Sequence, residues 1–178
     1  MELTRHCDLC ERKKSDFKLG LVCGLTSRKP AFNKTCSQIL LRDNFEEKLK
    51  QINLEYDQLK RKRLHTYSYT VGYILIGFII IATGYLIAYH INDVANKTSV
   101  RFYTYPLTFI AISFAPMGLG ISTFINYLQH LKVAKSKKED LDKVLVLYNI
   151  KYTIDIDYQT EFHGTQEVYI DLKVKGVR

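Results

Sequence analysis

Two stretches of this sequence lack any Asp, Glu, Lys or Arg, and this absence decides the class of protein. Residues 67–89 form an uncharged run of 23 residues, and residues 102–128 form one of 27. At about 1.5 Å per helical residue, each run can cross a hydrocarbon core of roughly 30 Å. A chain of 178 residues leaves no soluble fold large enough to cover both runs. We therefore expect two membrane-spanning helices.

Other absences narrow the function. Neither run holds an ionisable residue in its interior, and His90 and His130 stand only at the edges. Coupled transporters and proton relays place such groups at membrane depth, so transport by a single copy is not expected. Nucleophile motifs and glycine-rich phosphate loops are missing too, which predicts a protein that is not an enzyme. The first five residues contain no apolar run, so no cleaved targeting peptide is expected.

Basic residues on the flanks of the two runs predict their orientation. Clusters of Lys and Arg precede the first run and follow the second, while residues 90–101 form only a short link. Cytoplasmic flanks collect Lys and Arg, so both termini are expected inside. Anionic lipid explains these clusters, and nucleic-acid binding is not expected. The membrane-surface basic residues are Lys60, Arg61, Lys62, Arg63, Lys132, Lys135, Lys137 and Lys138.

Small residues within the runs predict close helix packing. Gly84 and Ala88 have small-xxx-small spacing in the first run, and Gly118 and Ser122 have it in the second. This spacing suits the internal hairpin or contact between copies. Pro116 predicts a kink in the second run.

Amphipathic helices are predicted on the cytoplasmic side of each run. Apolar residues between positions 45 and 59 recur with steps of three and four, which is the seam of a helix. Asn44 and Glu47 have the spacing of a capping box, and no Pro or Gly interrupts the stretch up to the first run. A weaker seam covers residues 131–148, where Tyr148 is its last member. We expect the two helices to pack as a short antiparallel stalk.

Four cysteines in the first 36 residues predict a metal site. Cys7 and Cys10 form a C-x-x-C pair, and Cys23 and Cys36 follow, each after twelve further residues. Because cytosolic thiols stay reduced, we expect these four side chains to bind one structural zinc ion tetrahedrally. Gly24 directly after Cys23 is typical of a zinc knuckle. The segment has few apolar residues of core size, so a metal would supply much of its folding energy.

Three alternatives to structural zinc stay open from the residues alone. They are a redox-active dithiol, an iron–sulfur cluster and a segment without metal, because the sequence has one C-x-x-C pair rather than two. Redox chemistry would usually require a thioredoxin-like unit, which does not fit into 36 residues. His6 is a further candidate ligand, although a histidine beside a metal loop is more often a bystander.

The end of the chain alternates apolar and polar residues, which predicts a β-hairpin with a turn at His163-Gly164. A lone hairpin is marginal in water, so its apolar face must be covered. Its polar face carries several acidic residues, but such faces are normally charged and catalysis is not expected there. The apolar face holds Tyr152, Ile154, Ile156, Tyr158, Val168, Ile170, Leu172 and Val174; the polar candidates are Asp155, Asp157, Glu161, His163 and Asp171.

The predicted fold is a mainly α membrane protein with a two-span helical hairpin, cytoplasmic helical extensions, a small zinc-binding segment and a C-terminal β-hairpin. The expected parts are a cysteine-rich head (residues 1–43), a cytoplasmic helix (44–66), a transmembrane helix (67–91), an external loop (92–101), a second transmembrane helix (102–129), a second cytoplasmic helix (130–150) and the β-hairpin (151–178).

Two segments carry a resemblance to a known group. DFKLGLVCGLT at residues 16–26 and FHGTQEVYIDLKVK at residues 162–175 resemble small uncharacterised bacterial two-span membrane proteins with a zinc-ribbon-like four-cysteine segment. The resemblance covers nearly the whole chain and implies an arrangement without an established activity. A looser similarity of architecture links the two spans to SLATT-type two-span effectors of bacterial defence systems. Neither the cysteine head nor the hairpin belongs to that second similarity.

The leading hypothesis is a non-enzymatic accessory or adaptor subunit of an inner-membrane complex. Its expected partners are membrane lipid and other protein subunits, which the zinc head and the β-hairpin would bind. A pore-forming effector assembled from several copies is the first alternative, because a wholly apolar hairpin can gate by dewetting. A membrane-anchored redox or metal sensor built on the four cysteines is the second.

Overall fold

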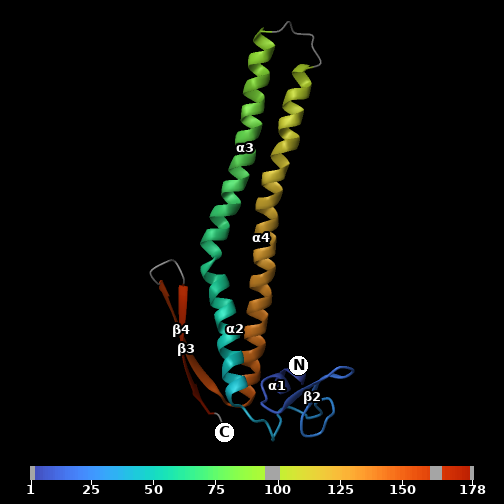
Figure 1. Ribbon diagram of the computed structural model, residues 1–178, viewed down its shortest axis with the longest axis vertical. Coiled ribbons are helices and arrows are strands. Elements are labelled where there is room, and N and C mark those ends of the chain that lie inside the picture. The colour runs from blue at the N-terminus through green and yellow to red at the C-terminus, as the bar shows by residue number, and fades with distance from the viewer. Residues whose placement is uncertain (1–2, 95–100, 161–165, 177–178) are drawn as a thin grey trace. The chain divides into compact units, whose positions relative to one another are not determined.

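The computed structural model describes residues 3–94, 101–160 and 166–176 (Figure 1). The chain is mostly helical, with two long apolar helices that could span a membrane and two small β-hairpins. It forms two compact units, one of Met1–Gln58 with Val133–Arg178 and one of Leu59–Lys132. The elements are α1 (Thr4–Asp8), β1 (Lys13–Asp16), β2 (Gly20–Cys23), α2 (Asp43–Arg61), α3 (Arg63–Val94), α4 (Arg101–Leu147), β3 (Lys151–Thr160) and β4 (Gln166–Lys175).

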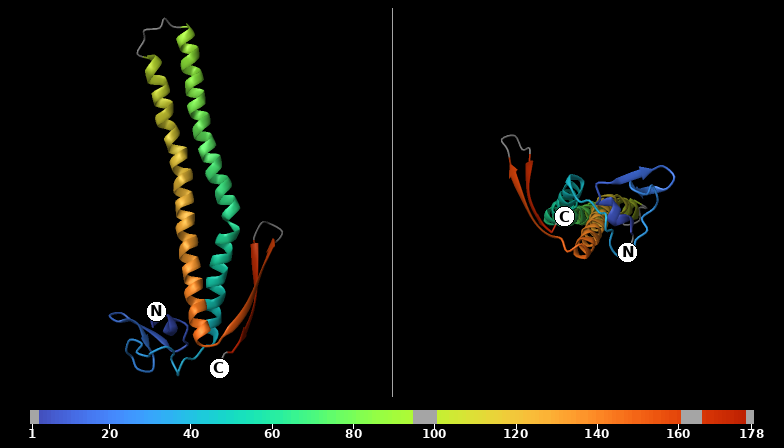
Figure 2. Two further views of the ribbon diagram at one scale, coloured as in Figure 1. Left: turned by 180° about the vertical axis from the view of Figure 1, so that it is seen from behind. Right: turned by 90° about the horizontal axis from the view of Figure 1, so that it is seen from below.

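In the unit of residues 59–132, α3 and the first part of α4 run side by side in both views (Figure 2). Glycines allow the close approach. A Cβ on Gly120 would lie 2.9 Å from the Cβ of Tyr73, and one on Gly84 would clash with Phe109. Gly77 meets Met117 in the same way. Any larger side chain at these three positions would therefore push the helices apart.

The predicted packing residues are only partly those that the helices use. Gly84 faces α4 and Ala88 is buried, as expected. Gly118 and Ser122 are exposed instead, and a Cβ on Gly118 would meet nothing within 4 Å. Their small-xxx-small spacing thus makes no contact within the described part of this hairpin. The nearby Gly120 packs in their place, because it lies on the face of α4 that meets α3.

The apolar side chains of these helices point outward. In the most apolar window of each long helix, only 17% and 11% of the residues are buried. Phe78 on α3 is 56% exposed and Phe114 on α4 is 67% exposed. A core helix of a soluble protein would bury such side chains. The helices therefore have the length and the outward apolar surface that a membrane span requires.

Two local predictions differ from the structure. A turn at Lys62 separates α2 from α3, where one uninterrupted helix was expected; like charges one turn apart at Lys60 and Arg63 disfavour the helix there. Helix α4 continues without a break through Pro116, and the kink expected there stays a prediction. The predicted capping box is wrong, because α2 begins before Asn44 and the carbonyl of Arg42 accepts the first N–H groups.

A buried core holds the other unit together. Phe45 and Leu49 of α2 are fully buried against Val144 and Leu145 of α4. Leu9 joins the same core from the segment after α1. The ammonium of Lys137 also contacts the Glu55 carboxylate at 3.1 Å, and that of Lys138 lies 5.2 Å from the ring centre of Tyr56. Helices α2 and α4 thus pack along the two seams that the sequence predicts.

The C-terminal β-hairpin is confirmed. Strands β3 and β4 are antiparallel, and their register pairs apolar residues with one another: Tyr152 with Val174, Ile154 with Leu172, Ile156 with Ile170 and Tyr158 with Val168. This face is half-buried and the polar face is exposed. Tyr152 and Leu172 pack on the core, and the Tyr158 hydroxyl bonds the Asp57 carboxylate at 2.9 Å. The ribbon lies along α2 (Figures 1 and 2). Its predicted turn at His163-Gly164 lies outside the described residues, as does most of the predicted external loop.

Candidate metal centre

A second, shorter hairpin builds the N-terminal head. Strands β1 and β2 pair antiparallel from Lys13 with Cys23 to Asp16 with Gly20. Between them, one carboxylate oxygen of Asp16 accepts the backbone N–H groups of Leu19 and Lys18, and these bonds lower the pKa of Asp16. Gly20 has a φ of 76°, which glycine adopts without strain. This hairpin was not predicted, although an Asp-to-Gly turn between two short segments is a usable signal.

A tight turn after β2 fixes the third cysteine. The N–H of Cys23 bonds the carbonyl of Arg28 at 3.0 Å, and the N–H of Gly24 bonds that of Arg12 at 2.9 Å. A Cβ on Gly24 would collide with the same Arg12 carbonyl. Gly24 is therefore required by the backbone of the neighbouring strand, and not only by a crowded sulfur.

All four predicted cysteines line one cavity of about 20 Å³. Cys7 comes from α1, Cys10 from the turn after it, Cys23 from β2 and Cys36 from the segment before α2. All four are free thiols; Cys7 is buried and the other three are half-buried. A cavity of this size holds about one water-sized sphere, and a single metal ion occupies a similar space.

The electrostatics of the cavity disfavour four negative charges without a cation. Burial, followed by the neighbouring Cys23, Cys36 and Cys10, raises the pKa of the Cys7 thiol to about 11. Backbone N–H groups, chiefly that of Leu25, lower the pKa of Cys23. A bound cation would reverse the repulsion and allow the thiols to ionise. Four thiolates are the donor type that structural zinc takes, and zinc binding here stays a prediction.

The four cysteine side chains lie farther apart than ligands of one metal ion would. Among the described residues, no group of three or more His, Cys, Asp or Glu side chains stands close enough to hold a metal ion. The fold thus brings the cysteines around one cavity, but their sulfur atoms are not close enough together to bind one metal ion. Of the polar residues named for the C-terminal hairpin, Asp155, Asp157 and Asp171 lie on its exposed face, whereas Glu161 and His163 lie outside the described residues.

His6 lies beside the cavity as part of a hydrogen-bonded group. It is 1% exposed, its ring stacks edge-on against Phe32, and its Nδ1 lies 3.0 Å from the hydroxyl of Tyr148. Burial lowers the pKa of His6. The Tyr148 hydroxyl also accepts the backbone N–H of Cys36 at 2.9 Å. Sequence reasoning assigned Tyr148 to the helix seam and missed this role, because its partners are 142 and 112 residues away.

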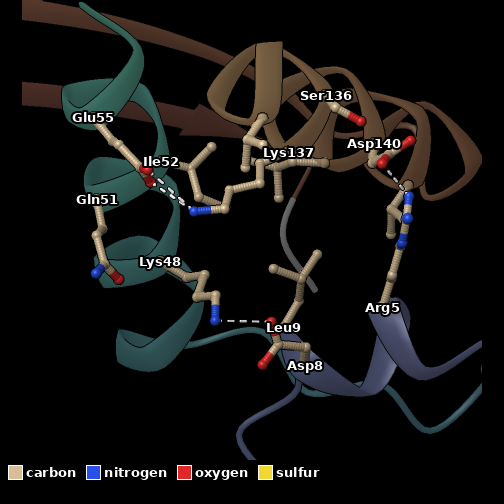
Figure 3. Close-up of a pocket in the computed structure, with 13 residues that line it drawn as sticks. Arg5, Asp8, Leu9, Lys48, Gln51, Ile52, Glu55, Ser136, Lys137 and Asp140 are labelled. Carbon is tan, nitrogen blue, oxygen red and sulfur yellow. Dashed lines mark hydrogen bonds and ion pairs between the residues drawn. The ribbon is translucent and has the colours of Figure 1, made fainter. Parts of the chain in front are cut away.

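Ion pairs surround a larger pocket where the head meets the two helices (Figure 3). The pocket has a volume of about 450 Å³ and an apolar floor that includes Leu9, Ile52 and Leu141. The pairs are Arg5 with Asp140, Lys48 with Asp8 at 2.8 Å and Lys137 with Glu55 at 3.1 Å, so each joins a different two of α1, α2 and α4. Part-exposed pairs contribute roughly 0–1 kcal/mol each. These ion pairs therefore add little to the stability of the unit, and they favour one orientation of the head on the helices.

The head presents an apolar tip among basic residues. Phe17 is fully exposed in the turn between β1 and β2, and Leu19 beside it is half-exposed. Lys18, directly after Phe17, and Lys14, three residues before it, are exposed, and neither makes an ion pair within the described structure. An aromatic and cationic surface of this kind is typical of a protein contact.

The predicted membrane-surface cations divide into two groups. Lys60, Arg61, Lys62, Arg63 and Lys132 are exposed, and Arg63 lies over the Tyr67 ring. Lys137, Lys138 and Lys135 instead contact Glu55, Tyr56 and Glu139.

Comparison of the chain with protein-family models, with curated proteins and with solved structures finds no match. The resemblance of the two quoted segments therefore stays a prediction.

Proposed function

We propose that this chain is a non-enzymatic adaptor of a bacterial inner-membrane complex. Helices α3 and α4 anchor it in the bilayer with both termini in the cytoplasm, and a zinc ion in the four-cysteine cavity organises the head. Protein partners bind the head and the C-terminal hairpin. The observation that carries the proposal is the exposed Phe17 beside the exposed Lys18, on a head that packs on a buried core.

The chemistry of this surface defines the partner. A protein that receives Phe17 needs an apolar pocket, and one that faces Lys14 and Lys18 needs acidic residues around that pocket. Burying a Phe side chain contributes about 1.5–3 kcal/mol, which is enough to matter in a modest interface. The long-range attraction between opposite charges would speed the encounter more than it would tighten the complex.

A photo-crosslinking amino acid at position 17, introduced in living cells, tests this proposal. We expect a discrete adduct with a foreign protein that disappears when Lys14 and Lys18 are changed to Glu. The matched control places the same group at Val146 of α4, which is 75% exposed and lies outside both proposed binding surfaces. A crosslinker at position 17 that captures nothing, or an adduct that the charge reversal leaves unchanged, contradicts the adaptor role of the head.

One observation favours the pore as a second candidate. Gly118 and Ser122 face outward on α4, where a second copy could pack closely. A pore predicts crosslinks between copies at position 122 and loss of membrane potential on overexpression. The adaptor predicts neither.

A further inference from the structure

We infer that Tyr148 is a positioning residue for Cys36, and that its hydroxyl sets how tightly the cysteine cavity holds a metal. The inference about metal rests on the zinc head of the proposed function; the inference about Cys36 does not. Two hydrogen bonds carry it. The Tyr148 oxygen lies 2.9 Å from the backbone nitrogen of Cys36 and 3.0 Å from Nδ1 of His6.

The donors and acceptors of this group allow both hydrogen bonds to form together when Nδ1 of His6 carries no proton. The N–H of Cys36 can only donate, so the hydroxyl oxygen accepts that bond. The hydroxyl proton is then free to be donated to Nδ1 of His6, which leaves the ring proton of a neutral His6 on Nε2. One side chain thus joins a cysteine and a histidine that both line the cavity.

Cys36 depends on this bond more than the other cysteines depend on any single contact. Cys7 is part of α1, Cys10 donates its N–H to the Cys7 carbonyl, and Cys23 belongs to β2. Cys36 lies in a segment without helix or strand. Its carbonyl accepts only a long bond of 3.4 Å from the N–H of Ile39. The Tyr148 hydroxyl therefore makes the shortest hydrogen bond described for the Cys36 backbone.

A further cavity beside this segment is consistent with this dependence. It has a volume of about 570 Å³ and is lined by Thr35, Cys36 and Ser37 together with Tyr148 and Asn149. The segment is therefore only partly packed against the end of the chain that follows α4. Hydrogen-bonding partners of metal ligands typically change metal affinity 10- to 100-fold when they are removed, and the weakest-held ligand is where such a loss is largest.

Tyr148→Phe in the full-length protein in detergent micelles tests the inference, with Tyr152→Phe as the matched control. Tyr152 also loses a hydroxyl bond, of 2.7 Å to Asp142, but lies on the C-terminal hairpin. We expect Tyr148→Phe to lower zinc affinity by about 10- to 100-fold in competition with a chromophoric chelator, and Tyr152→Phe to leave it unchanged. Equal affinities in both variants and the parent protein would overturn the inference, as would equal losses in both variants.

A second measurement keeps the test valid if the parent protein binds no zinc. The alkylation rates of Cys36 and Cys23 by iodoacetamide, followed by mass spectrometry in the metal-free protein, report on the position of each cysteine directly. Tyr148→Phe should accelerate alkylation of Cys36 several-fold relative to Cys23. An unchanged ratio contradicts the role of Tyr148, whereas zinc-free protein with the expected ratio contradicts only the proposed zinc head.

Discussion

The two β-hairpins of this chain belong to one compact unit but are stabilised in different ways. The C-terminal ribbon has ten residues in each strand, and a continuous apolar face packs toward α2 and α4. The N-terminal ribbon has four residues in each strand, and Val22 is its one fully buried residue. The long ribbon is thus stabilised by burial of alternate residues, whereas in the proposed zinc head the short one would gain its stability from the cysteines that bind the ion.

Removal of the proposed metal has the largest expected effect and should distinguish the two hairpins. Structural zinc in small domains contributes about 10–16 kcal/mol of apparent binding free energy. Chelation should therefore raise the amide hydrogen exchange of β1 and β2 toward that of an unfolded chain while β3 and β4 stay protected. The control is a variant with all four cysteines changed to Ser, in which the chelator should change nothing. Equal protection of β1 and β2 before and after chelation would show that the head folds without metal.

A core substitution should instead weaken both hairpins together. Leu145 is 2% exposed in the core that the head and the C-terminal hairpin share. Leu145→Ala is expected to lower the free energy of unfolding of this unit by about 2–5 kcal/mol, because it leaves a cavity. Leu147→Ala, two residues away and 41% exposed, should change it by less than about 1 kcal/mol. Urea unfolding followed by exchange mass spectrometry measures both. A loss confined to one hairpin would contradict the shared core.

The smallest expected effect belongs to the C-terminal hairpin alone and depends on pH. Burial, together with the nearby Asp142 carboxylate, raises the pKa of Tyr152 to about 12. Because this value is above the unfolded value of about 10, the hydroxyl stabilises the folded state below pH 10 and loses that contribution as pH rises toward 12. Tyr152→Phe should cost about 1–2 kcal/mol at pH 8 and less at pH 11. Unfolding curves across this range measure it; a cost that does not fall with pH contradicts the assignment.

The long elements could be predicted because their signals are local. An uncharged run of 23 residues and an alternation from Tyr152 to Tyr158 are visible in a short window of sequence. Boundaries were less reliable. The turn at Lys62 and the start of α2 before Asn44 depend on capping and charge repulsion over one or two residues, which a periodic pattern does not resolve.

Only the cysteine residues of the candidate site could be predicted from the sequence. The C-x-x-C pair and two later cysteines indicate four ligands, and the fold brings all four to one cavity. Tyr148 could not be found, because its contacts with Cys36 and His6 form only after α4 returns to the head. Gly118 and Ser122 show that a short motif does not by itself specify its contact, because both face outward within the described hairpin and contact between copies stays a prediction.

The most direct test of the account is the metal content and location of the full-length protein. After gentle fractionation of cells, we predict that the chain is found in the inner-membrane fraction, extractable only by detergent. Intact-complex mass spectrometry should then show one zinc ion per chain, lost in the variant with all four cysteines changed to Ser. Protein in the soluble fraction, or membrane protein that carries no metal, would contradict the picture of a membrane-anchored head organised by zinc.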